Sequence, residues 1–282
     1  MQKNNNMNGK ICMITGSNSG IGKATAIGLA EMGATIIMVC RNTDRGEKAK
    51  KEIIDKTSNT SIDLLLADLS SQQAIRNLVD NYQSKYEKLH VLINNAAIMP
   101  YKKTFTEDNN EMQFAVNVLA PFLLTNLLID ILKKSAPSRI LNVTSGLHTR
   151  AHIDFNNLQS EKKYSAFGTY GRVKLALVIF NNELARRLEN SGITVNSLHP
   201  GTIRSSLGRD LPWYYRWAIV FFRNPKKGAE TPVYLASSPE VEGISGKYFK
   251  NKKEAKPSKE ANNKEYGQKL WDICSELTNL NS

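Results

Sequence analysis

A glycine-rich turn near the N-terminus most constrains the fold of this chain. Residues 15–22 read TGSNSGIG and lie between a short apolar segment, 10–15, and a segment with helical periodicity, 21–32. Glycine lets the backbone turn tightly and approach a pyrophosphate, while the helix N-terminus offers N–H groups to phosphate. Glycines alone are weak evidence, but their place between strand and helix predicts a dinucleotide site. Its residues are Gly16, Ser17, Asn18, Ser19, Gly20, Ile21 and Gly22.

Short apolar segments alternate with amphipathic ones along most of the chain. We expect strands at 10–15, 35–39, 62–66, 91–93, 139–143, 194–198 and 246–249, and helices at 21–32, 44–56, 72–86, 111–133, 169–190 and 260–280. Near-continuous apolar strands alternating with helices indicate a parallel sheet covered on both faces. The expected fold class is therefore α/β, a doubly wound parallel sheet (Rossmann fold) of about seven strands with helices on both faces.

The domain organisation expected from this pattern is a single Rossmann-type domain over residues 1–282. Its core spans 8–250 and includes a substrate lid at about 203–227. A basic segment and a C-terminal helix follow over 251–282.

The charge balance needs an explanation. The chain has 38 Lys and Arg against 26 Asp and Glu, a net charge of +12, while its 41 % hydrophobic and 23 % charged residues are typical of a globular protein. Nucleic acid, an anionic membrane and a phosphorylated cofactor are candidate partners. Most of the excess lies in 204–227 and 247–259, each with six basic residues and one acid. No nucleic-acid module is recognisable, so nucleic acid is not expected as a partner.

Cysteine usage and the N-terminus indicate an intracellular protein. Cys12, Cys40 and Cys274 are odd in number and widely spaced, which argues against zinc or disulfides. The polar N-terminus lacks the apolar region of a secretory signal. The longest apolar runs, 122–132 and 213–222, are shorter than the roughly 20 residues that span a bilayer. We expect a cytoplasmic protein without a metal site.

The end of the second expected strand indicates which nucleotide binds. It reads Val39-Cys40-Arg41-Asn42, without the acid that NAD-binding domains usually place there to hold the ribose. Arg41 is a fixed cation suited to a 2′-phosphate, and Arg45 follows one helical turn later. These residues predict NADP(H), held by Arg41 and Asn42. The alternative is that both arginines are surface cations.

A tyrosine and a lysine occupy positions i and i+4 of an expected helix. Tyr170 and Lys174 therefore project from the same face. Tyrosine has a pKa of about 10, too high for easy proton exchange at neutral pH, and a neighbouring ammonium lowers it. A tyrosine and a lysine at this spacing are common by chance, so the value of the pair as evidence for a catalytic site depends on other motifs.

Together with the glycine turn and the motifs described below, the Tyr170 and Lys174 pair gives the chain a resemblance to the classical short-chain dehydrogenase/reductase family over about residues 8–250. Ser145 ends the fifth expected strand and matches the family's catalytic serine, ahead of Tyr170 and Lys174. Asn117 matches the helix asparagine that holds a proton-relay water. The resemblance implies an enzyme whose catalytic residues are Ser145, Tyr170, Lys174 and Asn117.

The resemblance also implies further cofactor contacts. Asp68-Leu69 matches the segment that contacts adenine, and Asn94-Asn95-Ala96-Ala97 matches the family's NNAG segment, with Ala97 in place of its last glycine. Ser205 stands where many members have a threonine that touches the nicotinamide carboxamide. The implied contacts are Asp68, Leu69, Asn95, Ala96, Tyr170, Lys174, Pro200, Gly201, Ile203 and Ser205.

Within this family, the chain resembles in particular the retinol dehydrogenase-like branch, which includes relatives of light-dependent protochlorophyllide reductase. It rests on Cys40-Arg41 and on segments 157–164, 183–188, 199–201 and 245–249. Members generally use NADP(H) on lipophilic alcohols, aldehydes or ketones. Many membrane-bound members carry an N-terminal anchor, and residues 1–10 do not resemble one, so a microsomal location is not expected. Homodimers and homotetramers are common in the family and are expected alternatives here.

The implied reaction is hydride transfer between the nicotinamide and a carbonyl or alcohol carbon. Tyr170 would donate the proton and Ser145 would orient the oxygen. Lys174 would lower the pKa of Tyr170 and hold the nicotinamide ribose, while Asn117 would link Lys174 to solvent through water. The alternative function is a catalytically weak, cofactor-binding regulatory or scaffold protein on the same fold.

Several other side chains have two interpretations. The aromatic segment 211–222 is either a lid helix packed on the core or an entrance for a lipophilic substrate that also contacts a membrane. His148 and His152 could line a pocket but are expected to be exposed, and His90 and His199 are expected to be structural. Candidate substrate contacts are Met99, Tyr101, Trp213 and Tyr214.

Overall fold

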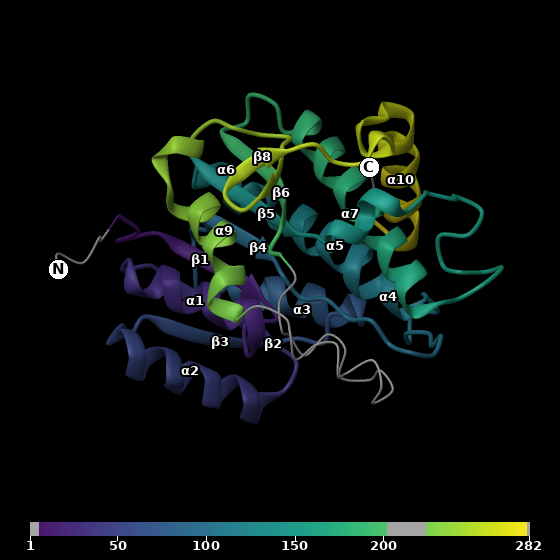
Figure 1. Ribbon diagram of the computed structural model, residues 1–282. Helices are drawn as coiled ribbons and strands as arrows, with labels where there is room; N and C mark the ends of the chain where they lie inside the picture. Colours follow the sequence, from purple (N-terminus) through teal and green to yellow (C-terminus); the bar gives the residue numbers. More distant parts are fainter. Residues whose placement is uncertain (1–5, 202–223, 281–282) are drawn as a thin grey trace.

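One sheet of eight strands organises the chain in the computed structural model, which describes residues 6–201 and 224–280 (Figure 1). The strand order is β3-β2-β1-β4-β5-β6-β7-β8, and all pairs are parallel except β7 with β8. The order reverses direction between β1 and β4, as in a doubly wound sheet. The strands are β1 (Ile11–Thr15), β2 (Thr35–Cys40), β3 (Ile62–Leu66), β4 (Val91–Asn94), β5 (Ser138–Val143), β6 (Ile193–His199), β7 (Tyr248–Lys250) and β8 (Lys253–Ala255).

Alternate side chains of the strands build a separate core on each face of the sheet. In β1, Cys12 and Ile14 pack with α1 (Gly20–Glu31), α2 (Thr43–Thr57) and α9 (Pro225–Ser237). Met13, between them, packs with the other face. That face is covered by α3 (Gln72–Gln83), α5 (Ala120–Leu127), α6 (Ile129–Lys134), α7 (Ala166–Arg187) and α10 (Lys264–Leu277). The predicted α/β fold with helices on both faces is confirmed.

The segment expected as one helix over 111–133 is a series of short helices. It begins with α4 (Met112–Phe114), widens into a π-helix (Ala115–Leu119) and continues as α5 and α6. The π-turn is closed by the bond from the Ala120 N–H to the Ala115 carbonyl. π-turns inside helices are rare and occur frequently at functional sites.

Two elements were missed by the sequence analysis. Helix α9 contains Pro232, which has no N–H to donate and disfavours a helix interior. The packing of α9 against α1 offsets the cost of this proline. A Cβ on Gly28 of α1 would lie 2.8 Å from Val233 Cγ2, which shows how closely the two helices approach. Strand β8 consists of three residues with little burial, which give no apolar pattern to detect.

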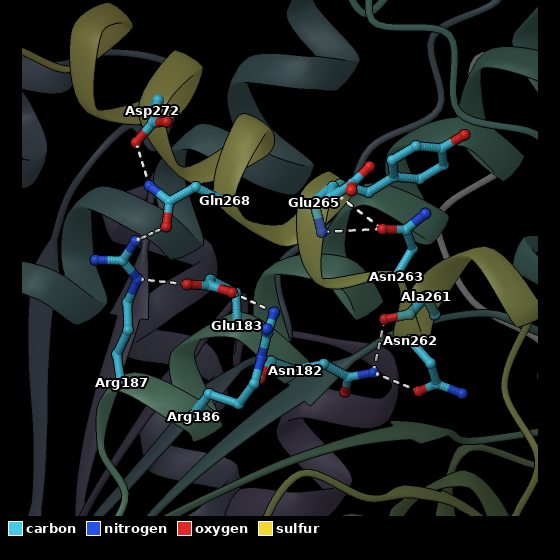
Figure 2. Close-up of polar contacts among 11 residues, drawn as sticks. Asn182, Glu183, Arg186, Arg187, Ala261, Asn262, Asn263, Glu265, Gln268 and Asp272 are labelled. Carbon is cyan, nitrogen blue, oxygen red and sulfur yellow. Dashed lines mark hydrogen bonds and ion pairs between the residues drawn. The ribbon is translucent and has the colours of Figure 1, made fainter.

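The C-terminal helix α10 is held on α7 by both apolar and polar contacts. Leu270 and Cys274 are fully buried, and the centre of the Trp271 ring lies 6.0 Å from that of Phe180 on α7. Figure 2 shows the polar side of the contact. Glu183, almost buried, accepts a bond from Arg187 Nε at 2.7 Å, and Arg187 also donates to Gln268 Oε1 at 2.9 Å.

Within residues 6–201 and 224–280, no helix combines enough length and apolar character to cross a membrane.

The docking of α10 predicts a large loss of stability when its buried leucine is shortened. Leu270→Ala should lower the free energy of unfolding by about 3 kcal/mol, because it removes packed methyl groups from the core. Urea denaturation measures the difference. Glu276→Ala, exposed on the same helix, is the control and should change stability by less than about 0.5 kcal/mol. Equal losses in the two variants would contradict the docked position.

Candidate active site

The predicted site residues gather at one edge of the sheet, where the strands end. The glycine turn follows β1, Arg41 follows β2, Asp68 lies beyond β3, Ser145 lies beyond β5 and Pro200 follows β6. In parallel sheets, the carboxyl ends of neighbouring strands meet, and ligands bind beside the point where strand order reverses. Residues distant in sequence are thus brought to one edge. Ile203 and Ser205, and the expected contacts Trp213 and Tyr214, lie outside the described residues.

The glycine turn closes so tightly that side chains would not fit. Gly16 and Gly20 have φ angles of +66° and +57°, in the left-handed region that favours glycine. A Cβ on Gly22 would lie 2.5 Å from the Gly16 carbonyl oxygen and from Asn95 Nδ2. Helix α1 begins directly after the turn and has no acidic residue in its first turn. The turn therefore fits the pyrophosphate of a dinucleotide, which the helix N-terminus would attract.

Contacts from β2 and β4 fix this turn. Asn95 Nδ2 donates to the Thr15 carbonyl at 2.7 Å, and the Thr15 hydroxyl accepts bonds from the N–H groups of Asn95 and Ala96 at 2.9 and 3.0 Å. The buried Ser17 hydroxyl lies 3.8 Å from Cys40 Sγ at the end of β2. Asn95, Ala96 and Ser17 therefore hold the shape of the turn.

Arg41 and Asp68, predicted from different motifs, lie side by side. Arg41 Nη1 is 3.5 Å from Asp68 Oδ2, and the Arg41 side chain is 75 % exposed. Asp68 Oδ1 accepts bonds from the Ser70 N–H at 3.0 Å and hydroxyl at 2.7 Å. The Asn42 side chain caps α2 by accepting from the Arg45 N–H. Arg41 thus presents a guanidinium to solvent beside the end of β2.

Helix α7 contacts the chain both before and after Ser145. Lys174, 1 % exposed, donates from Nζ to the carbonyl of Val143 at 3.1 Å, two residues before Ser145. A Cβ on Gly171 would lie 3.4 Å from the carbonyl oxygen of Leu147, two residues after Ser145. Lys174 Nζ is also 5.6 Å from the centre of the Tyr170 ring. Ser145, Tyr170 and Lys174 are therefore brought together.

Burial sets the protonation of the tyrosine and lysine in the protein alone. It raises the pKa of the Tyr170 phenol and lowers the pKa of the Lys174 ammonium to about 7. The expected lowering of the pKa of Tyr170 by Lys174 is not found in the protein alone, where loss of solvation raises the pKa of the phenol. Both side chains are shifted toward their neutral forms.

Asn117 lies in the π-helix with one polar atom unused. Its Nδ2 donates to the carbonyls of Ile98 and Gln113 at 3.0 and 2.9 Å. Its Oδ1 is buried and accepts no hydrogen bond from residues 6–201 or 224–280. A buried amide oxygen is normally hydrogen-bonded, so this atom is suited to accept a bond from water. The geometry fits the water-holding role implied for Asn117.

A chain of buried asparagine amides runs beneath the site, and the sequence analysis missed it. Asn94 Nδ2 donates to Asn142 Oδ1 at 2.9 Å and to the Thr125 hydroxyl at 3.0 Å, and Asn142 Nδ2 donates to Asn181 Oδ1 at 3.0 Å. The amides link β4, β5 and α7. The sequence does place an asparagine within each of these apolar segments. Because a buried amide requires a hydrogen-bond partner, these asparagines could have been expected to bond to one another.

The histidines differ in part from expectation. His152 is exposed and contacts Glu260, while His90 and His199 accept bonds from backbone N–H groups, as a structural role requires. His148, expected to be exposed, is fully buried because its ring bonds to backbone atoms on both sides. Met99 is buried and Tyr101 is exposed.

The described residues contain neither a group of His, Cys, Asp or Glu side chains suited to a metal ion nor a disulfide among their cysteines.

Comparison with known proteins agrees with the doubly wound α/β fold described above and identifies the chain as an oxidoreductase. The family model "short chain dehydrogenase" matches residues 10–212. Retinol dehydrogenase 13 of Mus musculus is 42 % identical over 96 % of this chain and 84 % of its own length. The chain therefore belongs to the short-chain dehydrogenase family, and it is an alcohol/carbonyl oxidoreductase.

Solved structures show the same architecture. An uncharacterised protein from Mycobacterium paratuberculosis has a TM-score of 0.80 at 28 % identity, covering 97 % of this chain and 94 % of its own. A short-chain dehydrogenase from Burkholderia cenocepacia in complex with NADP has a TM-score of 0.71 at 25 % identity, covering 87 % of this chain and 97 % of its own.

The buried lysine predicts a pH-dependent stability of the protein without cofactor. Lys174 titrates near 10.5 when unfolded and near 7 when folded. Between these values the unfolded chain binds more protons, so the free energy of unfolding rises with pH. Lys174→Met removes this penalty. It should be more stable than wild type at pH 7, although it loses the bond to Val143, and this advantage should shrink toward pH 10.

Urea denaturation across this pH range measures the effect. The control is Lys134→Met, which removes the same charge from an exposed position on α6 and should follow the wild-type curve. Parallel curves for Lys174→Met and wild type would show that the lysine keeps its ordinary pKa in the folded protein.

Proposed function

We propose that this protein is an NADP(H)-dependent oxidoreductase that transfers a hydride between the nicotinamide and the carbon of a lipophilic aldehyde, ketone or retinol-like alcohol. The observation that carries the proposal is that α7 contacts the chain both before and after Ser145. Lys174 bonds to the strand before Ser145, and Gly171, next to Tyr170, packs on the turn after it. These contacts support a site to which Ser145 contributes a hydroxyl, Tyr170 a phenol and Lys174 an amine.

The residues of the chain would handle the substrate oxygen and its proton. Bound cofactor supplies or accepts the hydride. The Ser145 hydroxyl donates a hydrogen bond to the carbonyl oxygen and orients it. The Tyr170 phenol then gives its proton to the oxygen as negative charge develops there. Lys174 stabilises the resulting phenolate, and a water on Asn117 Oδ1 would connect the lysine to solvent.

The burial of Tyr170 suits the reducing direction. A raised pKa keeps the phenol protonated at neutral pH, so the donor is ready before reaction. An alkoxide is more basic than a phenolate, which keeps the transfer favourable. Lys174, with a pKa of about 7, is partly charged at neutral pH and can gain a proton as the phenolate forms.

The site's apolar surroundings support a lipophilic substrate. Among the described residues, five large apolar side chains are exposed, and four of them lie on the loop after β4, the turn after Ser145 or the first turn of α7. These four are Tyr101, Phe105, Leu147 and Phe167. The similarity to a retinol dehydrogenase over nearly the whole chain supports the same substrate class.

Tyr170→Phe tests the role of the phenol. The variant keeps the ring but lacks the proton, so kcat for carbonyl reduction should fall by about 10²–10⁴-fold while NADPH still binds. Turnover is followed by NADPH consumption with a panel of lipophilic aldehydes and ketones, and binding by NADPH fluorescence. Tyr164→Phe, which removes a phenol hydroxyl bonded to the Pro100 carbonyl on the loop after β4, is a comparison for a hydroxyl that only holds structure. Near-normal kcat in Tyr170→Phe would overturn the proposal.

Arg41→Ala tests the choice of nucleotide. Loss of a charge-assisted phosphate contact should weaken NADPH binding by about 10–100-fold and leave NADH binding nearly unchanged. Titration calorimetry with both nucleotides measures the effect. Lys48→Ala removes an exposed charge from α2 and serves as the control. Equal NADPH affinity in Arg41→Ala and wild type would reject Arg41 as the 2′-phosphate residue.

A further inference from the structure

Two histidine rings hold the backbone of Ser145 and Gly146 from opposite sides. His148 Nδ1 lies 2.7 Å from the Ser145 carbonyl oxygen. The Gly146 N–H donates to His199 Nδ1 at 3.2 Å. A Cβ on Gly146 would lie 3.3 Å from His199 Nε2, so this backbone rests directly on the His199 ring. The groups on both sides of the peptide bond that follows Ser145 are therefore bonded to imidazoles.

The partners of His148 determine which ring nitrogen carries its proton. A carbonyl oxygen can only accept, so Nδ1 must carry the proton that bonds to Ser145. The Ser258 N–H donates to Nε2 at 3.3 Å, so Nε2 must be free of a proton. Both contacts hold together only for a neutral ring protonated at Nδ1.

His199 requires the opposite arrangement. Because its Nδ1 accepts from the Gly146 N–H, that nitrogen must be unprotonated, and a neutral ring then carries its proton on Nε2. A positively charged ring would turn this acceptor into a donor and break the contact.

We propose that His148 and His199 are positioning residues for the proposed catalytic serine, and that they act as neutral imidazoles in opposite tautomers. This rests on the proposed function, in which Ser145 orients the substrate oxygen. His148 donates to the peptide group after Ser145 and His199 accepts from it, which fixes the turn that aims the hydroxyl. Through Ser258, His148 also ties the segment after β8 to the site.

The surroundings keep both rings neutral. The ring of Tyr248 on β7 meets the His148 ring edge-on at 4.8 Å, and Lys250 on β7 disfavours a second charge on His199. His148 also disfavours protonation of His199. Burial lowers the pKa of both rings, that of His199 to about 4. Burial therefore favours the neutral form of both rings.

The tautomers can be measured without any assay of activity. The chain has four histidines, so long-range ¹H–¹⁵N correlation spectra of histidine-labelled full-length protein resolve each ring, with single His→Asn variants giving the assignments. We expect the Nδ1–H form for His148 and the Nε2–H form for His199. His90, whose Nδ1 accepts from the Ile11 N–H, should match His199. An Nε2–H or charged His148 at neutral pH would overturn the proposal.

Kinetics then test whether the contact to Ser145 positions the serine. His148→Asn places an amide N–H near the position of Nδ1, whereas His148→Gln places its amide near Nε2. We expect His148→Asn to keep kcat within about 3-fold and His148→Gln to lose about 10–100-fold, with the KM for NADPH little changed in both. His199→Asn, which keeps an acceptor for Gly146, should resemble His148→Asn. His90→Asn, at the opposite edge of the sheet, is the control for loss of a half-buried imidazole far from Ser145.

The outcomes separate this inference from the proposed function. If Ser145→Ala and Tyr170→Phe retain full turnover, the proposed chemistry is wrong even if the spectra show the expected tautomers. If those two variants are inactive but His148→Gln keeps the wild-type kcat, the chemistry stands and the positioning role is wrong. Equal losses in His148→Asn and His148→Gln would also contradict it, because a general packing defect does not distinguish the two nitrogens.

Discussion

The closeness of α1 to the end of β1 is the constraint on which the rest of the site depends. The helix can start immediately after the turn because Gly22 carries no side chain to collide with the Gly16 carbonyl. Thr15 then bonds to two successive N–H groups of the segment after β4. The strands on either side of the reversal in strand order are therefore locked in register, and the neighbouring ends of β5 and β6 follow from that register.

The residues whose positions the sequence predicted well are those whose placement follows from local spacing. The glycine turn lies between a strand and a helix, and Tyr170 and Lys174 share one helix face, so each could be placed without knowing the rest of the fold. Arg41 and Asp68 follow successive parallel strands, which is enough to bring them together. In a parallel α/β sheet, short motifs that follow different strands come to lie at the same edge of the sheet.

What could not be predicted depends on contacts between distant segments. The burial of His148 depends on Ser258, which is 110 positions away in the chain. The amides of Asn94, Asn142 and Asn181 find one another only when β4, β5 and α7 have assembled. The shift in the pKa of Tyr170 has the same origin, since the spacing of two residues carries no information on solvent exclusion.

The contact between Ser258 and His148 has a consequence for the order in which the protein becomes competent. Domains fold as their segments leave the ribosome, N-terminal parts first, and the glycine turn and its β-strands are complete early in synthesis. The hydrogen bonds around Ser145 are complete only after residue 258 has emerged and taken its place. The last helix docks later still, where Gln72 and Arg76 of α3 donate to the carbonyls of Leu277 and Thr278 at its end. A nascent chain would thus complete the glycine turn well before the hydrogen bonds around Ser145.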